Sequence, residues 1–208
     1  MATGGIYEAI LNFDIEKARE LTRAEIEAGT DVDTILNDGM ISAMDEVGKR
    51  FSEGELFVPE MLRAAMAMKA GLEVLKPYLK GEEVVRKGTV VIGTVKGDLH
   101  DIGKNLVAMM LEGAGFEVVD LGTDVDAGDF VKAAEESRAD VVALSALLTT
   151  TMPQMEATIA AIKEAGLEVK TIVGGAPVTQ DFANQIHADG YSDDAPGGVE
   201  LVRKLVGV

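Results

Sequence analysis

The stretch "TVVIGTVKGDLHDIG" at residues 89–103 decides the fold of the second half of the chain. It opens with a short apolar run rich in β-branched residues, passes through a glycine-containing turn and leads into a helical pattern. Such a run bounded by turn residues is typical of a fully buried strand. Just beyond the strand stand Asp98, His100 and Gly103, and His100 is one of only two histidines in the chain. A histidine at the mouth of a buried strand needs a chemical explanation.

Four more apolar segments follow, and segments with helical periodicity separate them. Strands that alternate with helices indicate a parallel sheet covered by helices on both faces. The predicted class of residues 89–208 is therefore α/β with a five-stranded parallel sheet. The expected strands lie at 89–95, 116–122, 140–148, 168–175 and 189–192, and the expected helices at 103–113, 127–137, 153–165, 179–188 and 195–206.

Residues 1–80 carry helical periodicity throughout and predict a four-helix bundle. Asp14 is a candidate N-cap, Gly29 is a candidate C-terminal stop, and Pro59 stands near a helix start, where its missing N–H costs nothing. The charged residues 81–88 offer few core positions and predict a linker between the bundle domain and the sheet domain. The expected helices lie at 6–11, 14–29, 31–51 and 58–79.

Composition and charge exclude several classes of protein. The chain has 208 residues, and 47% of them are hydrophobic, which is enough for packed cores. It has no cysteine, which excludes disulfide scaffolds and thiolate-ligated metal sites. No apolar run reaches membrane-spanning length. The net charge of −17 would repel nucleic-acid phosphates. We expect a cytoplasmic protein that binds neither nucleic acid nor membrane.

Three polar or glycine-rich segments follow predicted strands and should meet at one edge of the sheet. "GDLHDIG" follows the first strand, "SALLTTT" the third and "GGAP" the fourth. Ligands of open α/β sheets bind beyond the carboxyl ends of the strands, so this edge is the expected site. It offers the hydroxyls of Ser145, Thr149 and Thr151 and the small residues Gly103, Gly174 and Gly175.

His100 can give a neutral imidazole nitrogen to a metal, or it can donate a proton. Asp98, two residues earlier, can accept a hydrogen bond from the other ring N–H, which fixes the tautomer. With no cysteine and no second histidine nearby, the other ligands of a metal must come from a cofactor, which points to a tetrapyrrole-type macrocycle. Taken alone, the motif fits an ordinary strand–turn–helix with a solvated histidine equally well, and the glycine pair fits a simple turn.

The conjunction of these segments resembles the cobalamin-binding signature Asp-x-His-x-x-Gly, Ser-x-Leu and Gly-Gly. The matching pieces are Asp98-Leu-His100-Asp-Ile-Gly103, Ser145-Ala-Leu147 and Gly174-Gly175, at spacings that fit the family. The first half is similar as well: "RFSEGELFVPEMLRAAMAMKAGLEVLKP" resembles the helical cap of methionine synthase and of stand-alone corrinoid proteins. The resemblance implies a helical bundle followed by a flavodoxin- or Rossmann-like cobalamin-binding domain.

The resemblance also implies roles for individual residues. His100 would be the lower axial ligand of cobalt in place of the cofactor's own base (base-off, His-on), Asp98 would hydrogen-bond His100, and Thr151 would be the third member of this catalytic relay. The residues that would line the cofactor and its nucleotide tail are Gly103, Ser145, Leu147, Thr149, Gly174, Gly175 and Ala195. The residues that would cover the methyl-bearing face are Phe51, Phe57, Val58 and Met61.

The function implied is that of a methyl carrier, which binds methylcobalamin, Co(I)-cobalamin or a related corrinoid. Its expected partners are a substrate-specific methyltransferase, a second methyltransferase that uses tetrahydrofolate or coenzyme M, and a reductive activase. The chain alone should show no turnover. The alternative is the cobalamin-binding subunit of an adenosylcobalamin-dependent mutase, against which the "FVPEM" cap argues.

Overall fold

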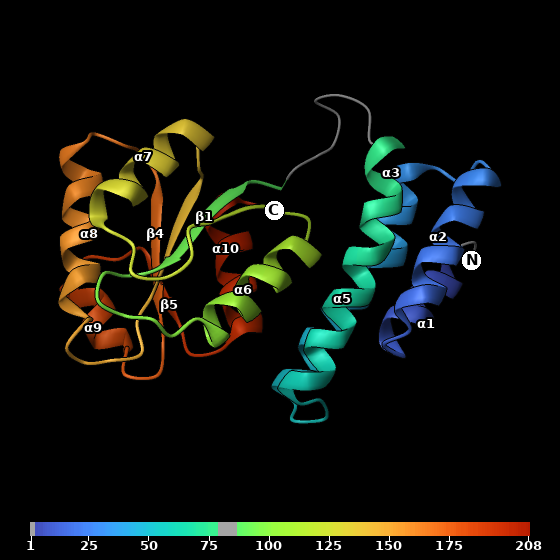
Figure 1. Ribbon diagram of the computed structural model, residues 1–208, viewed down its shortest axis with the longest axis horizontal. Helices are drawn as coiled ribbons and strands as arrows, with labels where there is room; N and C mark the ends of the chain where they lie inside the picture. Colours follow the sequence, from blue (N-terminus) through green and yellow to red (C-terminus); the bar gives the residue numbers. More distant parts are fainter. Residues whose placement is uncertain (1–2, 79–86) are drawn as a thin grey trace. The chain divides into compact units, whose positions relative to one another are not determined.

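The computed structural model describes residues 3–78 and 87–208, which form two compact units (Figure 1). We call residues 3–78 the helical unit and residues 87–208 the sheet unit. Most of the predicted linker at 81–88 lies outside the described residues. Within them, none of the helices combines the length and the apolar character that crossing a bilayer requires.

The helical unit contains the predicted helices, and local sequence explains where several of them begin. Asp14 caps α2 by accepting the Lys17 N–H, and Asp31 caps α3 by accepting the Thr34 N–H. The predicted helix at 31–51 is continuous but contains a π-helical segment. The elements are α1 (Gly4–Leu11), α2 (Ile15–Glu27), α3 (Val32–Thr34), the π-helix η1 (Ile35–Ile41), α4 (Ser42–Ser52), α5 (Val58–Leu75) and the 3-10 helix η2 (Lys76–Tyr78).

The sheet unit confirms the predicted α/β class. Within residues 87–208 a five-stranded sheet runs in the order β2-β1-β3-β4-β5 with every neighbouring pair parallel. This is the flavodoxin-like order. The chain leaves β1 towards β2 on one side and leaves β3 towards β4 on the other, so a crevice opens at the carboxyl ends of β1 and β3. The strands are β1 (Thr89–Thr94), β2 (Glu117–Asp120), β3 (Val141–Ser145), β4 (Lys170–Gly174) and β5 (Gly190–Ser192).

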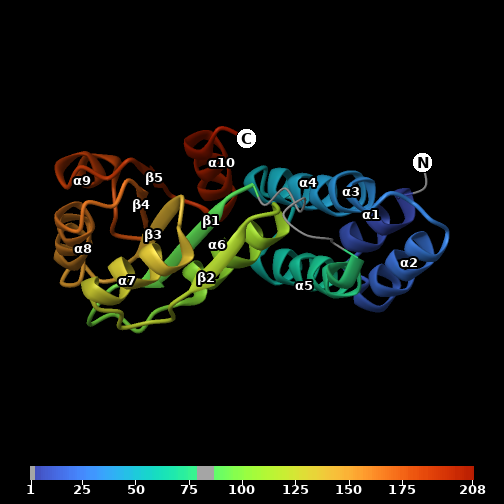
Figure 2. The same cartoon turned by 90° about the horizontal axis from the view of Figure 1, so that it is seen from above.

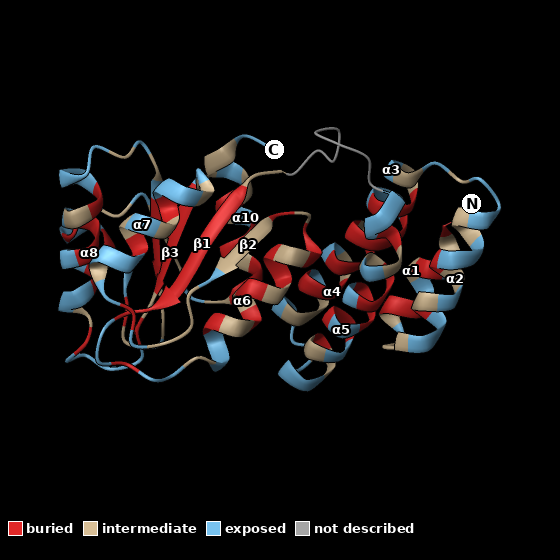
Figure 3. Cartoon of the chain, turned by 45° about the horizontal axis from the view of Figure 1, so that its top comes forward, coloured by how far each residue is buried: buried red, intermediate tan, exposed pale blue. Residues whose placement is uncertain are grey.

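Helices cover both faces of this sheet. One face packs against α7, α8 and α9 through a cluster around the fully buried Phe130, and α6 and α10 lie on the other side (Figures 1 and 2). Every residue of the interior strand β1 is buried, as expected for a strand covered on both faces (Figure 3). The helices are α6 (Ile102–Gly113), α7 (Ala127–Ser137), α8 (Pro153–Glu164), α9 (Gln180–Gln185) and α10 (Ala195–Val206).

The third strand differs from its prediction at the end that matters for the site. The apolar pattern predicts a strand to residue 148, but β3 ends at Ser145. The backbone N–H groups of Leu147 and Leu148 donate to the carboxylate of Asp98, so they cannot pair with a neighbouring strand. A buried charge therefore decides where the strand stops.

Close packing between β1 and α7 gives a first test of the fold. A Cβ on Gly93 would lie 2.7 Å from Cζ of Phe130, so Gly93→Ala should lower the free energy of unfolding by about 1–3 kcal/mol. Urea denaturation measures this change. Adding Phe130→Leu should give a double variant that loses less than the sum of the two single changes, because the clash is relieved.

Gly128→Ala on α7 is the matched control. A Cβ there meets nothing within 4 Å, so this variant should be unchanged or more stable by up to about 1 kcal/mol. Strict additivity of Gly93→Ala and Phe130→Leu would contradict the packing argument.

Candidate functional site

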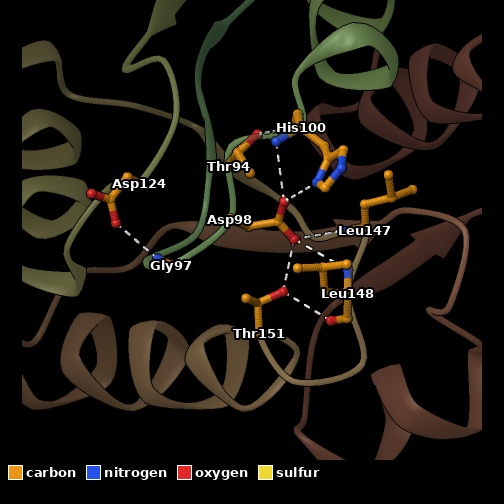
Figure 4. Close-up of polar contacts among 8 residues, drawn as sticks. All are labelled: Thr94, Gly97, Asp98, His100, Asp124, Leu147, Leu148 and Thr151. Atoms are coloured by element: carbon orange, nitrogen blue, oxygen red, sulfur yellow. Dashed lines mark hydrogen bonds and ion pairs between the residues drawn. The ribbon is translucent and has the colours of Figure 1, made fainter.

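The centre of the site is the carboxylate of Asp98, which lies fully buried in the loop between β1 and α6 (Figure 4). Its Oδ2 accepts hydrogen bonds from the Leu147 N–H (2.8 Å), the Leu148 N–H (3.2 Å) and the Thr151 hydroxyl (2.7 Å). Its Oδ1 accepts the His100 N–H (3.1 Å) and lies 2.7 Å from Nδ1 of the His100 ring. One carboxylate thus ties the β1–α6 loop to the β3–α8 loop.

These hydrogen bonds determine the charge of Asp98. Burial by itself would raise the pKa of the carboxyl, but hydrogen bonds from Thr151, from the His100 ring and from backbone N–H groups hold the pKa well below its usual range. Asp98 is therefore ionised at neutral pH.

The charge of Asp98 fixes the tautomer of His100. A carboxylate can only accept hydrogen bonds, so the proton between the two groups is on Nδ1 of the ring. In the neutral imidazole Nε2 then carries a free lone pair, and among the residues that the structure describes it has no hydrogen-bond partner. The pair presents a single nitrogen ligand with a fixed tautomer, which a metal can use.

Large apolar residues are exposed in the two loops that meet at Asp98. Leu99 is 73% exposed and Ile102 is 78% exposed, on either side of His100 in the chain. Leu147 and Leu148, whose N–H groups bind Asp98, are also exposed, and the His100 side chain is 51% exposed. We call these four aliphatic residues the apolar collar. A cluster of exposed apolar residues marks a surface that a ligand or partner covers.

The glycines predicted to clear space have different explanations. A Cβ on Gly103 would meet nothing within 4 Å, so packing within the chain does not require glycine there. Glycine near a helix start costs stability relative to alanine, which supports a ligand as the reason. Gly175, by contrast, has φ +130° and a Cβ would lie 1.9 Å from the Ala146 carbonyl oxygen, so the backbone alone requires glycine.

The register of the sheet brings the other predicted residues to one edge. Ser145 pairs with Thr94 of β1 and with Gly174 of β4, and Gly174 pairs with Ser192 of β5. Ala195 begins α10 directly after this edge and is buried. Thr149 is exposed in the β3–α8 loop. The segments that follow β1, β3 and β4 therefore meet as predicted.

The four predicted cap residues lie in the helical unit, at the end of α4 and the start of α5. Phe57 is 69% exposed, Val58 is 36% exposed and Phe51 is partly exposed. Met61 is fully buried, so a packing role is enough to explain it. That these residues cover the methyl-bearing face of the cofactor stays a prediction.

Sequence reasoning missed part of the site. It did not single out Leu99, Ile102 or Leu148. The apolar residues Leu99 and Ile102 beside His100 were an available signal, whereas Leu148 was predicted to end a strand. It also missed Asp124, whose carboxylate accepts the Gly97 N–H in the loop that carries Asp98.

Comparison with known proteins covers both units. A family model described as "B12 binding domain" matches residues 88–200, and another with the same description matches residues 4–76. The chain is 47% identical to trimethylamine corrinoid protein 1 of Methanosarcina acetivorans over 96% of this chain and 94% of that protein. It is 45% identical to dimethylamine corrinoid protein 1 of the same organism, over 85% of this chain and 84% of that one.

Solved structures agree. A chain of the methanol:cobalamin methyltransferase complex from Methanosarcina barkeri superimposes with a TM-score of 0.90 at 32% identity, over 99% of this chain and 80% of that chain. A cobalamin-binding protein from Desulfitobacterium hafniense superimposes with a TM-score of 0.81 at 31% identity, over 98% of each chain.

The buried carboxylate predicts a pH-dependent stability. Asp98→Asn replaces one acceptor oxygen by an amide that opposes the N–H donors, so the unfolding free energy of the cofactor-free protein at pH 7 should fall by more than about 2 kcal/mol. Because the folded pKa of Asp98 is lowered, its stabilisation is complete above the unfolded pKa of about 4 and is lost as the pH falls through the folded pKa.

The difference in unfolding free energy between the wild type and Asp98→Asn should therefore shrink below about pH 4, which urea denaturation at several pH values measures. Asp126→Asn is the control, since its exposed carboxylate pairs with Lys96 and such pairs contribute at most about 1 kcal/mol. A constant difference from pH 7 to pH 3 would show that the charge of Asp98 is not what stabilises the fold.

Proposed function

We propose that this chain, which belongs to the B12-binding family, receives its methyl group from a methylamine. It is a methyl-carrying corrinoid protein of a methyltransferase system, so it must take the methyl group from a donor. The proposal follows the pattern of identity. The relatives named trimethylamine and dimethylamine corrinoid proteins are 47% and 45% identical to this chain. In the structural comparisons, the methanol-system chain and a monomethylamine corrinoid protein of Methanosarcina barkeri are each 32% identical, so the pattern favours trimethylamine or dimethylamine as the donor. Methanol is the second candidate donor, because that chain superimposes over nearly the whole length. The mutase alternative is not favoured.

The residues at the site fit a corrinoid. His100 offers one nitrogen, Nε2, which suits a metal whose other ligands would come from a macrocycle. The apolar collar offers exposed aliphatic surface on which a large ring can lie, and Gly103 leaves open space beside it. When bound, the corrinoid supplies a cobalt centre that takes up and gives up the methyl group.

Three residues of this chain would hold the metal of the cofactor. His100 provides the ligand nitrogen, and the Asp98 carboxylate holds the ring in the tautomer that exposes Nε2. The Thr151 hydroxyl donates a hydrogen bond to the Asp98 carboxylate and so favours its charged form while it is buried.

The remaining contacts are assigned through the family. Ser145, Thr149, Gly174 and Ala195 stand along the carboxyl edge of the sheet and would accommodate the nucleotide tail. Gly175 belongs to the same edge, although backbone packing also requires it. Leu147 would contact the ring as part of the apolar collar. The cap residues Phe51, Phe57, Val58 and Met61 would shield the methyl-bearing face from water.

The chain works with a substrate-specific methyltransferase. We further propose a second methyltransferase with coenzyme M or tetrahydrofolate as the acceptor, a reductive activase, and a cytoplasmic location. Substrate chemistry belongs to the partners in this scheme, so the purified chain should show no turnover by itself.

The ligand role of His100 can be tested because the chain has only one other histidine, His187. Protein refolded with hydroxocobalamin should bind it in an equimolar ratio, and His100→Ala should still bind it through the collar and the tail contacts. The EPR spectrum of the Co(II) state should lose its axial-nitrogen splitting in His100→Ala.

His187→Asn should keep that splitting, and asparagine tolerates the φ of +59° at this position. Protein that refolds but stays colourless would reject the corrinoid assignment. A nitrogen splitting that survives in His100→Ala would remove this histidine from its role.

The methylamine donor is tested by reconstitution with partner enzymes. The Co(I) form should be methylated by a trimethylamine- or dimethylamine-specific methyltransferase with its amine, and much more slowly by a methanol-specific enzyme with methanol. The visible absorbance change of the corrinoid reports the transfer. Methylation with the methanol pair alone would reject the methylamine proposal and keep the methyl-carrier function.

A further inference from the structure

The turn at residues 95–98, which carries Asp98, is hydrogen-bonded to Asp124 in the β2–α7 loop. The Asp98 N–H donates to the Val95 carbonyl, and Gly97 within this turn has φ +80°. The Gly97 N–H donates to Oδ1 of Asp124 at 2.8 Å, and the Asp124 N–H donates to the Asp98 carbonyl at 3.0 Å. Three consecutive peptide groups around Asp98 are thus each fixed by a hydrogen bond, and Asp124 makes two of these bonds.

Asp124 is itself firmly anchored next to β1. It lies in the β2–α7 loop, and the following residue, Val125, donates its N–H to the Thr94 carbonyl and forms a parallel bridge with Val95. Asp124 therefore connects the turn to the end of the sheet and not to a free loop.

The backbone of Asp124 is in an unusual conformation. Its φ is +56°, in the left-handed region that non-glycine residues adopt at some cost. In this conformation the N–H and the carboxylate of the same residue both face the Asp98 turn. Strain of this kind persists where the surroundings impose it, and it concentrates at functional sites.

We propose that Asp124 is a positioning residue that holds Asp98, and through Asp98 holds the His100 ring in the tautomer that exposes Nε2. This deepens the proposed function, because it assigns a further residue to the ligand pair. Figure 4 shows the chain of contacts from Asp124 through Gly97 and Asp98 to His100.

The physical reason is the freedom of the Gly97 turn. Gly97 is exposed, so without the Asp124 carboxylate its N–H can turn to water at little cost. A glycine in this turn also offers little resistance to rotation of the peptide group before it. Such rotation would shift Asp98 relative to the His100 ring, and the hydrogen bond of 2.7 Å that fixes the tautomer would weaken.

Three substitutions separate the possible roles of Asp124. Asp124→Gly keeps a backbone that accepts positive φ but removes the acceptor, so it should release the turn. Asp124→Asn keeps an acceptor oxygen and tolerates this φ but removes the charge, so it should behave like the wild type. Both Asp124 and Asp126 pair with Lys96. Asp126→Asn therefore removes a charge from the same loop without removing the acceptor of the Gly97 N–H, and it serves as the control for charge.

The first measurement uses cofactor-free protein and nitrogen NMR of the two histidine rings. In the wild type His100 should be in the Nδ1–H tautomer when neutral, and His187 serves as an internal reference. Asp124→Gly should move His100 towards a mixture of tautomers, and Asp124→Asn and Asp126→Asn should not. Asp124→Ala also removes the acceptor but is strained at φ +56°, so its comparison with Asp124→Gly separates the loss of the acceptor from backbone strain.

The second measurement uses protein loaded with hydroxocobalamin and reduced to Co(II). The fraction of Co(II) protein that shows an axial nitrogen in EPR should fall in Asp124→Gly. The fall should be smaller than the roughly 10–100-fold loss of metal affinity that is typical when a residue touching a metal ligand is changed. Unchanged His100 signals in folded Asp124→Gly would overturn the proposal, and so would an Asp124→Asn defect as large as that of Asp124→Gly. The NMR result does not depend on corrinoid binding, so failure of this inference is distinguishable from failure of the proposed function.

Discussion

The hydrogen-bonded carboxylate of Asp98 is the interaction on which the rest of the site depends. An ionised carboxylate is costly to bury unless donors surround it, and here the donors come from its own loop and from the segment after β3. Supplying the Leu147 and Leu148 N–H groups ends the strand at Ser145 and turns the chain outward. The same turn exposes two leucines of the apolar collar. One buried charge thus sets the tautomer of His100, the end of β3 and part of the surface around the ligand nitrogen.

The topology of the sheet explains why these parts meet. In the order β2-β1-β3-β4-β5, β1 and β3 are neighbours although α6, β2 and α7 separate them in the chain. The switch of direction at this point leaves the carboxyl ends of both strands uncovered by a crossover, which is where α/β sheets bind ligands. The edge then continues through the small residues Ser145, Gly174 and Ser192. A rigid sheet with a bare edge suits a cofactor that must be held while partner enzymes reach it.

The division of labour in a methyl carrier agrees with what this chain contains. The hydrogen bonds from Asp124 through Asp98 to His100 hold and orient one nitrogen. Each step is short and fixed by hydrogen bonds, so the geometry of the ligand is set before a cofactor arrives. Such preorganisation lowers the cost of binding, because the protein does not have to order these groups when it binds.

The sequence by itself determined the α/β class, the helical first half and the Asp98–His100 pair, because each is encoded by local periodicity or by residues two apart beside a strand end. The contacts of Asp98 with Leu147, 49 residues later, and of Gly97 with Asp124, 27 residues later, were decided only by the tertiary structure. Gly103 and Gly175 are alike as letters, yet one faces open space and the other a carbonyl oxygen. The physical reason is that these features depend on which strands lie side by side and on where each chain leaves the sheet, and a linear pattern of apolar and polar residues does not specify either.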